Sequence, residues 1–160
     1  MSVPQPGDPL PPLALRDERG APFPRPAGET LYVFFKTTCP TCELTWPYLD
    51  RIRRAGDGGS FRVLGVSQDA PAPTRAFGER LGARLETAYD GEPWPSSEAL
   101  GLTTVPTFVR VGPDGVVAET VEGFDRARLE GFARRAAEGA GREHAPLFRP
   151  DDTAPQVKPG

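Results

Sequence analysis

The sequence predicts an α/β domain with a central mixed sheet and helices on both of its faces. Apolar runs of strand length alternate with segments whose apolar residues recur at helical spacing, a pattern typical of parallel strands joined by helices. The run from Leu31 to Phe35 is continuously apolar, as expected of a strand buried on both faces. Near the end, two apolar runs flank Gly112-Pro113-Asp114-Gly115, which predicts a hairpin and therefore antiparallel strands.

The individual elements follow from this spacing and from the turn residues between the runs. A long helix is predicted over residues 40–54, directly after the first central strand. Ser96 or Ser97 is expected to cap a short helix that Gly101 ends. The other expected elements are a short hairpin over residues 13–23, strands over 61–66, 85–89, 105–111 and 116–121, and helices over 73–81 and 125–138.

Length and charge bound the organisation of the chain. Its 160 residues suit one domain, which we place at residues 1–138, with residues 139–160 as a flexible, polar C-terminal tail. The net charge of −3 is spread out without a basic run, which argues against nucleic acid as a partner. No apolar stretch is long enough to span a membrane, and no signal peptide is visible, so we expect a cytoplasmic monomer, with an extracytoplasmic location as the alternative if a leader has been removed.

The two cysteines, Cys39 and Cys42, form a Cys-Pro-Thr-Cys motif between the first central strand and the first long helix. A sulfur at a helix N-terminus is stabilised as a thiolate by free backbone N–H groups and the helix dipole. The thiolate is the form that attacks disulfides, so we expect Cys39 to be a partly exposed nucleophile and Cys42 a more buried second thiol. His144 is the only histidine, which argues against a structural zinc site or a Cys-His catalytic pair.

Several further segments carry a resemblance to a known family. They are Gly7-Asp8-Pro9, Leu13-Ala14-Leu15 and Asp17-Glu18-Arg19-Gly20 near the start, Phe61 to Ser67 with Asp69, Tyr89-Asp90, Thr104-Val105-Pro106-Thr107 and the turn at 112–115. Together with the Cys-x-x-Cys motif, they resemble the thioredoxin superfamily, and within it the redoxin branch that contains TlpA-like thiol-disulfide oxidoreductases. The resemblance covers about residues 5–138 and implies a thioredoxin-like fold with an added N-terminal β-hairpin.

The resemblance also implies roles for the site residues. Cys39 would attack a substrate disulfide and Cys42 would resolve the mixed disulfide, while the intervening Pro40 and Thr41 tune the reduction potential. Pro106 would follow a cis peptide bond and pack near the cysteines, and the backbone of Val105 would pair with a bound substrate peptide. The expected partners are protein disulfides or dithiols and an unidentified electron donor, with no cofactor and no metal.

The chain departs from the family pattern around the cysteines. Thr38 stands where members usually have a Trp, and Val33 where thioredoxins carry a buried acid. TlpA-like proteins often place a Glu three residues after the second cysteine, and here that residue is Thr45. Glu43 directly follows Cys42 and is expected to point elsewhere. The sequence therefore lacks the familiar proton acceptor for Cys42.

Two other functions compete with disulfide exchange. A peroxiredoxin-like peroxidase would need a Thr three residues before its reactive cysteine, and this position holds Lys36. A non-enzymatic module could bind a soft metal such as Cu(I) through both thiolates. Of the two tryptophans, Trp46 is predicted to pack in the core, whereas Trp94 fits a core or a substrate surface equally well.

Overall fold

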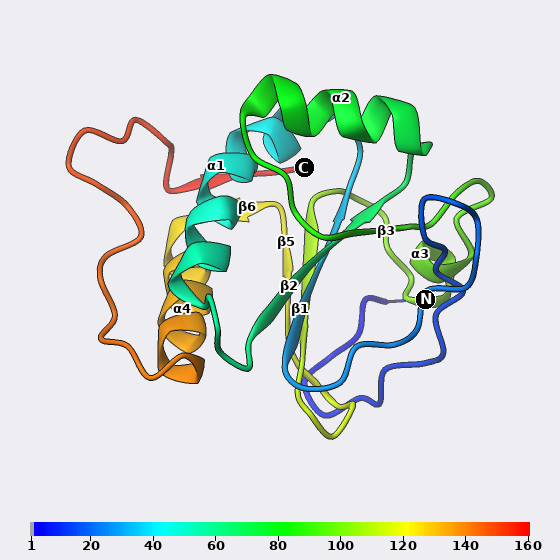
Figure 1. Ribbon diagram of the computed structural model, residues 1–160, viewed down its shortest axis with the longest axis horizontal. Coiled ribbons are helices and arrows are strands. Elements are labelled where there is room, and N and C mark those ends of the chain that lie inside the picture. Colours follow the sequence, from blue (N-terminus) through cyan, green and yellow to red (C-terminus); the bar gives the residue numbers. More distant parts are fainter. Residues whose placement is uncertain (1) are drawn as a thin grey trace.

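A five-stranded mixed sheet in the order β3-β2-β1-β4-β5 forms the centre of the computed structural model, which describes residues 2–160 (Figure 1). The strands of this sheet are β1 (Thr30–Phe35), β2 (Arg62–Ser67), β3 (Thr87–Tyr89), β4 (Thr107–Val111) and β5 (Val117–Glu122). The helices are α1 (Pro40–Ala55), α2 (Pro71–Leu81), α3 (Pro95–Ala99) and α4 (Arg126–Gly139), and a small separate sheet pairs β6 (Phe124–Asp125) with β7 (Val157–Lys158).

Strand β1 lies at the centre of the sheet. It pairs in parallel with β2 on one side and antiparallel with β4 on the other, which confirms the mixed sheet that the sequence predicts. All six of its residues are buried, as the unbroken apolar run indicates. The predicted hairpin around residues 112–115 is confirmed by the antiparallel pairing of β4 with β5.

Side chains alternate from β1 into two hydrophobic cores. Leu31, Val33 and Phe35 face a core built with α1, α4 and Phe77 of α2. Tyr32 and Phe34 face the opposite core, which is closed by the N-terminal segment and by residues just after α3. Helices therefore cover both faces of the sheet, with α1 and α4 on one face and the short α3 on the other (Figure 1).

The N-terminal segment crosses the second face and reaches both edges of the sheet. Pro9 forms a bridge with Val116 at one edge, and Arg16 forms a bridge with Tyr89 at the other. The expected hairpin is present as a tight turn in which a single bridge joins Arg16 to Pro22. Because unpaired sheet edges invite aggregation, this crossing segment protects the sheet as well as closing its core.

The N-terminus of the short helix α3 is not capped by a serine, although the sequence predicts one. Neither serine is its N-cap residue, which is Trp94 in a left-handed conformation. Instead, the buried carboxylate of Asp90 accepts hydrogen bonds from the backbone N–H groups of Ser96 and Ser97, at 2.9 and 2.8 Å. The carboxylate also accepts a bond from the Ser97 hydroxyl at 2.6 Å. An acid six residues upstream thus satisfies the free donors at the start of this helix.

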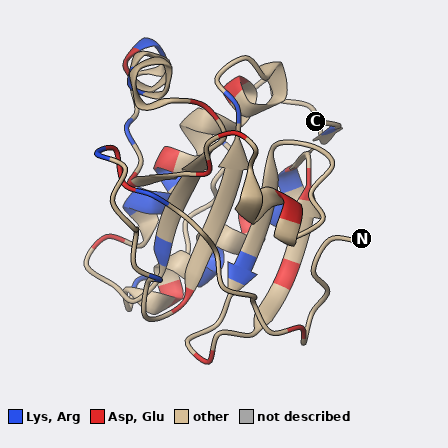
Figure 2. Ribbon diagram, turned by 90° about the vertical axis from the view of Figure 1, so that its right-hand side faces the viewer, with Lys and Arg blue, Asp and Glu red and all other residues tan. Residues whose placement is uncertain are grey.

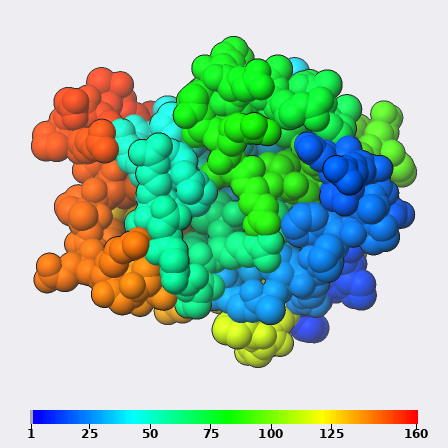
Figure 3. Space-filling model, in the orientation of Figure 1, coloured from blue at the N-terminus to red at the C-terminus, as the bar shows by residue number. Residues whose placement is uncertain are grey.

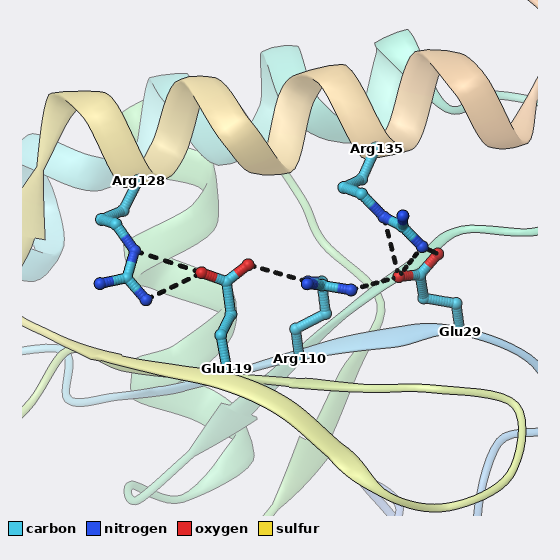
Figure 4. Close-up of polar contacts among 5 residues, drawn as sticks. All are labelled: Glu29, Arg110, Glu119, Arg128 and Arg135. Atoms are coloured by element: carbon cyan, nitrogen blue, oxygen red, sulfur yellow. Dashed lines mark hydrogen bonds and ion pairs between the residues drawn. The ribbon is translucent and has the colours of Figure 1, made fainter. Parts of the chain in front are cut away.

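A chain of five charged side chains ties α4 to the sheet (Figure 4). Arg110 on β4 lies between the carboxylates of Glu29 and Glu119, at 2.7 and 2.9 Å. Arg135 and Arg128 reach from α4 to the same two carboxylates, each at 2.8 Å. Arg110 and Glu29 are well shielded from water, so their charges depend on one another for compensation.

Residues 140–160, which the sequence predicts as a flexible tail, pack against the body along α1 (Figure 3). Leu147 is buried in the core, and the ring of Phe148 lies 4.5 Å from that of Tyr48. Arg51 of α1 forms an ion pair with Asp152 at 2.8 Å. The segment then pairs with β6 through β7 and ends beside the start of α1 (Figure 1).

Charged residues of both signs are interspersed over the face shown in Figure 2, as the spread of charge along the sequence predicts. Within residues 2–160, no helix is long and apolar enough to cross a membrane.

Replacing Glu29 by Gln should lower the free energy of unfolding by about 2 kcal/mol, because Arg110 loses its most buried carboxylate partner. Arg128→Gln is the matched control: this more exposed side chain belongs to the same chain of charges, and its loss should cost under about 1 kcal/mol. Urea unfolding followed by circular dichroism measures both values. Equal costs for the two variants would contradict this assignment.

Candidate active site

The two cysteines lie where the carboxyl end of β1 passes into α1. Residues 36–39 form the connection, and Cys39 is the N-cap residue of the helix. Its Sγ accepts a hydrogen bond from the backbone N–H of Cys42 at 3.1 Å. Such a donor, with the positive end of the helix dipole behind it, stabilises negative charge on the sulfur. Cys39 is partly exposed, whereas the Cys42 side chain is 1% exposed, as the sequence predicts.

The Cys42 thiol lies in surroundings that keep it protonated. Burial raises its pKa well above the ordinary value, and the side chain of Cys39 raises it further. The carboxylate of Glu43 points away to Arg80, at 3.1 Å. Thr45 donates its hydroxyl to the carbonyl of Thr41, and Val33 is part of the core. None of these three residues therefore offers a carboxylate to Cys42.

The loop that precedes β4 faces the first cysteine. The Val105–Pro106 bond is cis, as the resemblance implies. The Sγ of Cys39 lies 3.5 Å from the carbonyl oxygen of Val105, which accepts its hydrogen bond. On its other side the loop is held by the N–H of Gly123, which donates to the carbonyl of Pro106 at 2.8 Å. Segments 66 residues apart in the chain therefore meet at one sulfur.

Asp69 is one of the residues that carry the family resemblance, and it positions the connection before Cys39. Its carboxylate accepts hydrogen bonds from the N–H and the hydroxyl of Thr37, at 2.7 and 2.8 Å. The neighbouring Lys36 directs its ammonium group over the ring of Trp94, 4.6 Å from the ring centre, rather than toward the sulfurs. The sequence could have indicated that Asp69 lies near Cys39. Both residues follow parallel strands, and parallel strands bring their carboxyl ends to the same edge of the sheet.

A cavity of about 370 Å³ adjoins the cis-proline loop. Its walls include Lys36, Gln68, Trp94, Ser97 and Val105. Trp94 is half-buried, donates its indole N–H to the carbonyl of Gln68 at 2.9 Å, and forms part of the cavity wall. This places Trp94 at a surface beside the site, whereas Trp46 is buried in the core as predicted.

Pro40 and Thr41, between the cysteines, contribute in different ways. Pro40 occupies the first helical position, where a missing N–H costs nothing. Thr41 is buried, and its hydroxyl donates to the backbone carbonyl of Pro159 at 2.7 Å. The Thr41 hydroxyl is thus directed to a residue 118 positions further along the chain. Among residues 2–160, no third acidic or histidine side chain joins the cysteines in a metal-binding cluster.

Comparisons with known proteins agree with this architecture. No protein-family model matches the chain, and no curated protein matches it by sequence. Solved structures do match. A candidate thiol:disulfide interchange protein DsbE from Chlorobium tepidum superposes with a TM-score of 0.72 at 19% identity, over 87% of this chain and 100% of that one. The chain has the thioredoxin fold.

Two further solved structures match most of this chain and nearly all of their own. One is a secreted disulfide oxidoreductase from Mycobacterium tuberculosis, with a TM-score of 0.61 at 17% identity over 76% of this chain and 93% of that one. The other is StoA from Bacillus subtilis, with a TM-score of 0.62 at 16% identity over 78% and 98%. At these identities the shared property is the thioredoxin fold, and the activity has to be argued from the site.

Alkylation of the reduced protein by iodoacetamide at about pH 7 should modify Cys39 first, because Cys42 is buried and its thiol stays protonated. Cys42 should react only after unfolding in guanidinium. Peptide mapping by mass spectrometry identifies the labelled residue. Earlier modification of Cys42 in the native protein would reverse the assignment of the two thiols.

The reduced protein should lose stability relative to a Cys42→Ala variant as the pH rises through 9.0, the ordinary pKa of the thiol. The pKa of Cys42 is raised in the folded state, so above pH 9.0 the unfolded chain ionises first and its free energy falls. We expect a relative loss of about 1.4 kcal/mol between pH values of about 8 and 10. Buried tyrosines with raised pKa values, such as Tyr32, contribute equally to both proteins and cancel. Parallel curves in urea titrations would contradict the prediction.

Proposed function

We propose that the protein is a thiol-disulfide oxidoreductase that acts as a reductase on disulfides of polypeptide substrates. One observation carries the proposal: the Sγ of Cys39 accepts the N–H of Cys42 at 3.1 Å and lies 3.5 Å from the carbonyl of Val105. A sulfur stabilised by a helix N-terminus is thereby placed beside a backbone acceptor to which an incoming chain can bind. The thioredoxin fold shared with the disulfide oxidoreductases above supports it.

The reaction balances with the two thiols alone. The Cys39 thiolate attacks one sulfur of the substrate disulfide, so that a Cys39–substrate disulfide forms and the other substrate sulfur leaves as a thiolate. Cys42 then attacks the Sγ of Cys39, giving the Cys39–Cys42 disulfide and releasing the second substrate thiol. Two electrons pass from the protein to the substrate, and a separate electron donor must reduce the pair again.

The proton of Cys42 has a natural acceptor in this scheme. Burial raises the pKa of Cys42, and no carboxylate takes its proton in the resting site. The substrate thiolate released in the first step is formed beside the site and can accept the proton. Cys42 would therefore become nucleophilic only after the mixed disulfide exists.

A thiol peroxidase remains a weaker candidate, and the structure gives it no support. The residue three before Cys39 is Lys36, whose ammonium group lies over Trp94. The hydroxyl of the adjacent Thr37 is held by Asp69. No side-chain hydroxyl from these two residues is left to polarise a peroxide at Cys39.

The cellular compartment of the protein is also a matter of proposal. The comparisons do not support the cytoplasmic location that the sequence predicts, because the similar Mycobacterium tuberculosis protein is described as secreted.

The reduction potential of the Cys39–Cys42 pair tests the direction of electron flow. A value near about −270 mV fits a reductase, and one near about −120 mV would make the protein a disulfide-forming oxidant.

Cys42→Ser should accumulate a mixed disulfide between Cys39 and its substrates, because the thiol that resolves this intermediate is gone. Cys39→Ser should trap nothing, since the buried Cys42 cannot reach an external disulfide. Non-reducing electrophoresis of each variant after incubation with oxidised insulin measures the difference. Equal trapping by both variants would rule out the two-step mechanism.

Three assays on the wild-type protein separate the candidate functions. We expect turbidity from insulin reduction in the presence of dithiothreitol, no consumption of hydrogen peroxide above the rate of Cys39→Ser, and no copper retained after dialysis. Peroxide consumption without insulin reduction would favour the peroxidase, and stoichiometric Cu(I) without either activity would favour the metal-binding module.

A further inference from the structure

Pro159 and Gly160 lie against the candidate active site. The carbonyl of Pro159 accepts the hydroxyl of Thr41, the residue between the two cysteines and Cys42, at 2.7 Å. Gly160 packs so closely on the cis-proline loop that a Cβ atom added to it would lie 2.1 Å from the carbonyl oxygen of Val105. That oxygen is the one 3.5 Å from the Sγ of Cys39. Figure 1 shows this end of the chain beside the start of α1.

A second contact fixes the segment in an extended form. Val157 and Lys158 pair antiparallel with Asp125 and Phe124 of β6, which leads into α4. Gly123, just before β6, has a positive φ of 77°, and a Cβ there would lie 2.8 Å from the carbonyl of Lys158. Glycine at position 123 therefore lets the segment approach the backbone closely. We refer to residues 157–160 as the terminal strand.

The terminal strand is attached more weakly than the residues before it. Residues 147–154 are anchored by the buried Leu147, by the ion pair of Arg51 with Asp152, and by Arg126, which donates to the carbonyl of Ala154 at 2.7 Å. By contrast, the terminal strand buries no large side chain: it is held by a two-residue pairing and by the hydrogen bond from Thr41, and Val157 is 63% exposed. The strand can therefore leave the site while the anchor stays in place.

An extended polypeptide substrate needs the space that the terminal strand fills. A substrate chain that pairs with the backbone of Val105, as the family resemblance implies, would run along the carbonyl beside Cys39, where Gly160 lies. Cys39 itself remains partly exposed, so a small disulfide does not need that space.

We propose, on the basis of the function proposed above, that the terminal strand occupies in cis the strip where an extended polypeptide substrate docks. It competes with such substrates and has to leave before Cys39 can attack them. An open fraction of one tenth would lower the apparent affinity for polypeptides about tenfold, without changing the reactivity of the two thiols.

Gly160→Ala tests this in the full chain, because its methyl group would collide with the Val105 backbone and dislodge the strand. A variant that ends at Gln156 removes the strand and keeps the anchor. Gly131→Ala is the matched control, since a Cβ at this helical position meets no atom within 4 Å. Each protein is assayed for reduction of insulin, a polypeptide, and of 5,5′-dithiobis(2-nitrobenzoic acid), a small disulfide.

We expect Gly160→Ala and the shortened variant to reduce insulin up to about tenfold faster at low substrate concentration, with rates on the small disulfide within about twofold of wild type. Gly131→Ala should match wild type on both substrates. A synthetic peptide of residues 154–160 should inhibit the shortened variant on insulin. Unchanged insulin rates, or equal acceleration on both substrates, would overturn the inhibitory role while leaving the oxidoreductase intact. Failure of every protein on the small disulfide would instead overturn the proposed function.

Discussion

The burial of β1 on both faces is the constraint on which the rest of the structure depends. A strand with six buried residues must be paired on both edges and covered on both sides, because its backbone and side chains have no access to water. The parallel pairing with β2 and the antiparallel pairing with β4 meet the first demand. Helices α1 and α4 on one face, and the N-terminal segment with α3 on the other, meet the second.

This arrangement decides where chemistry can occur. The carboxyl end of β1 delivers Cys39 to the first turn of α1, and the parallel neighbour β2 delivers Asp69 to the same edge of the sheet. The antiparallel neighbour β4 begins at that edge, which brings the Val105–Pro106 bond to the sulfur. The site therefore combines a helix N-terminus, an anchored connection and a backbone acceptor, each supplied by an element that β1 holds in place.

The site differs from the family pattern in its handling of the buried thiol. With Val33 in the core and Glu43 paired to Arg80, Cys42 is surrounded by apolar groups and its pKa is raised. A buried acid would hasten loss of its proton, and in the proposed mechanism its absence makes that step depend on groups the substrate brings. The proposed displacement of the terminal strand would add a second dependence on substrate, because Thr41 and Val105 are already in contact with the chain's own residues.

The sequence by itself determined the order of the helices and of the strands in the central sheet, the buried central strand, the hairpin and the placement of both cysteines at a helix start. These features depend on local periodicity, turn residues and the residues at helix ends, all of which lie close together in the sequence. The cap of α3 by Asp90, the contact of Lys36 with Trp94 and the return of residues 157–160 to Thr41 were decided only by the tertiary structure. Each joins residues distant in sequence or unrelated by any period, so it exists only once the sheet has brought them together. The segment 140–160 shows the reason most clearly: polar and rich in proline, it lacks a core of its own, and it packs because Tyr48 and Arg51 of α1 offer it an apolar ring and a charge.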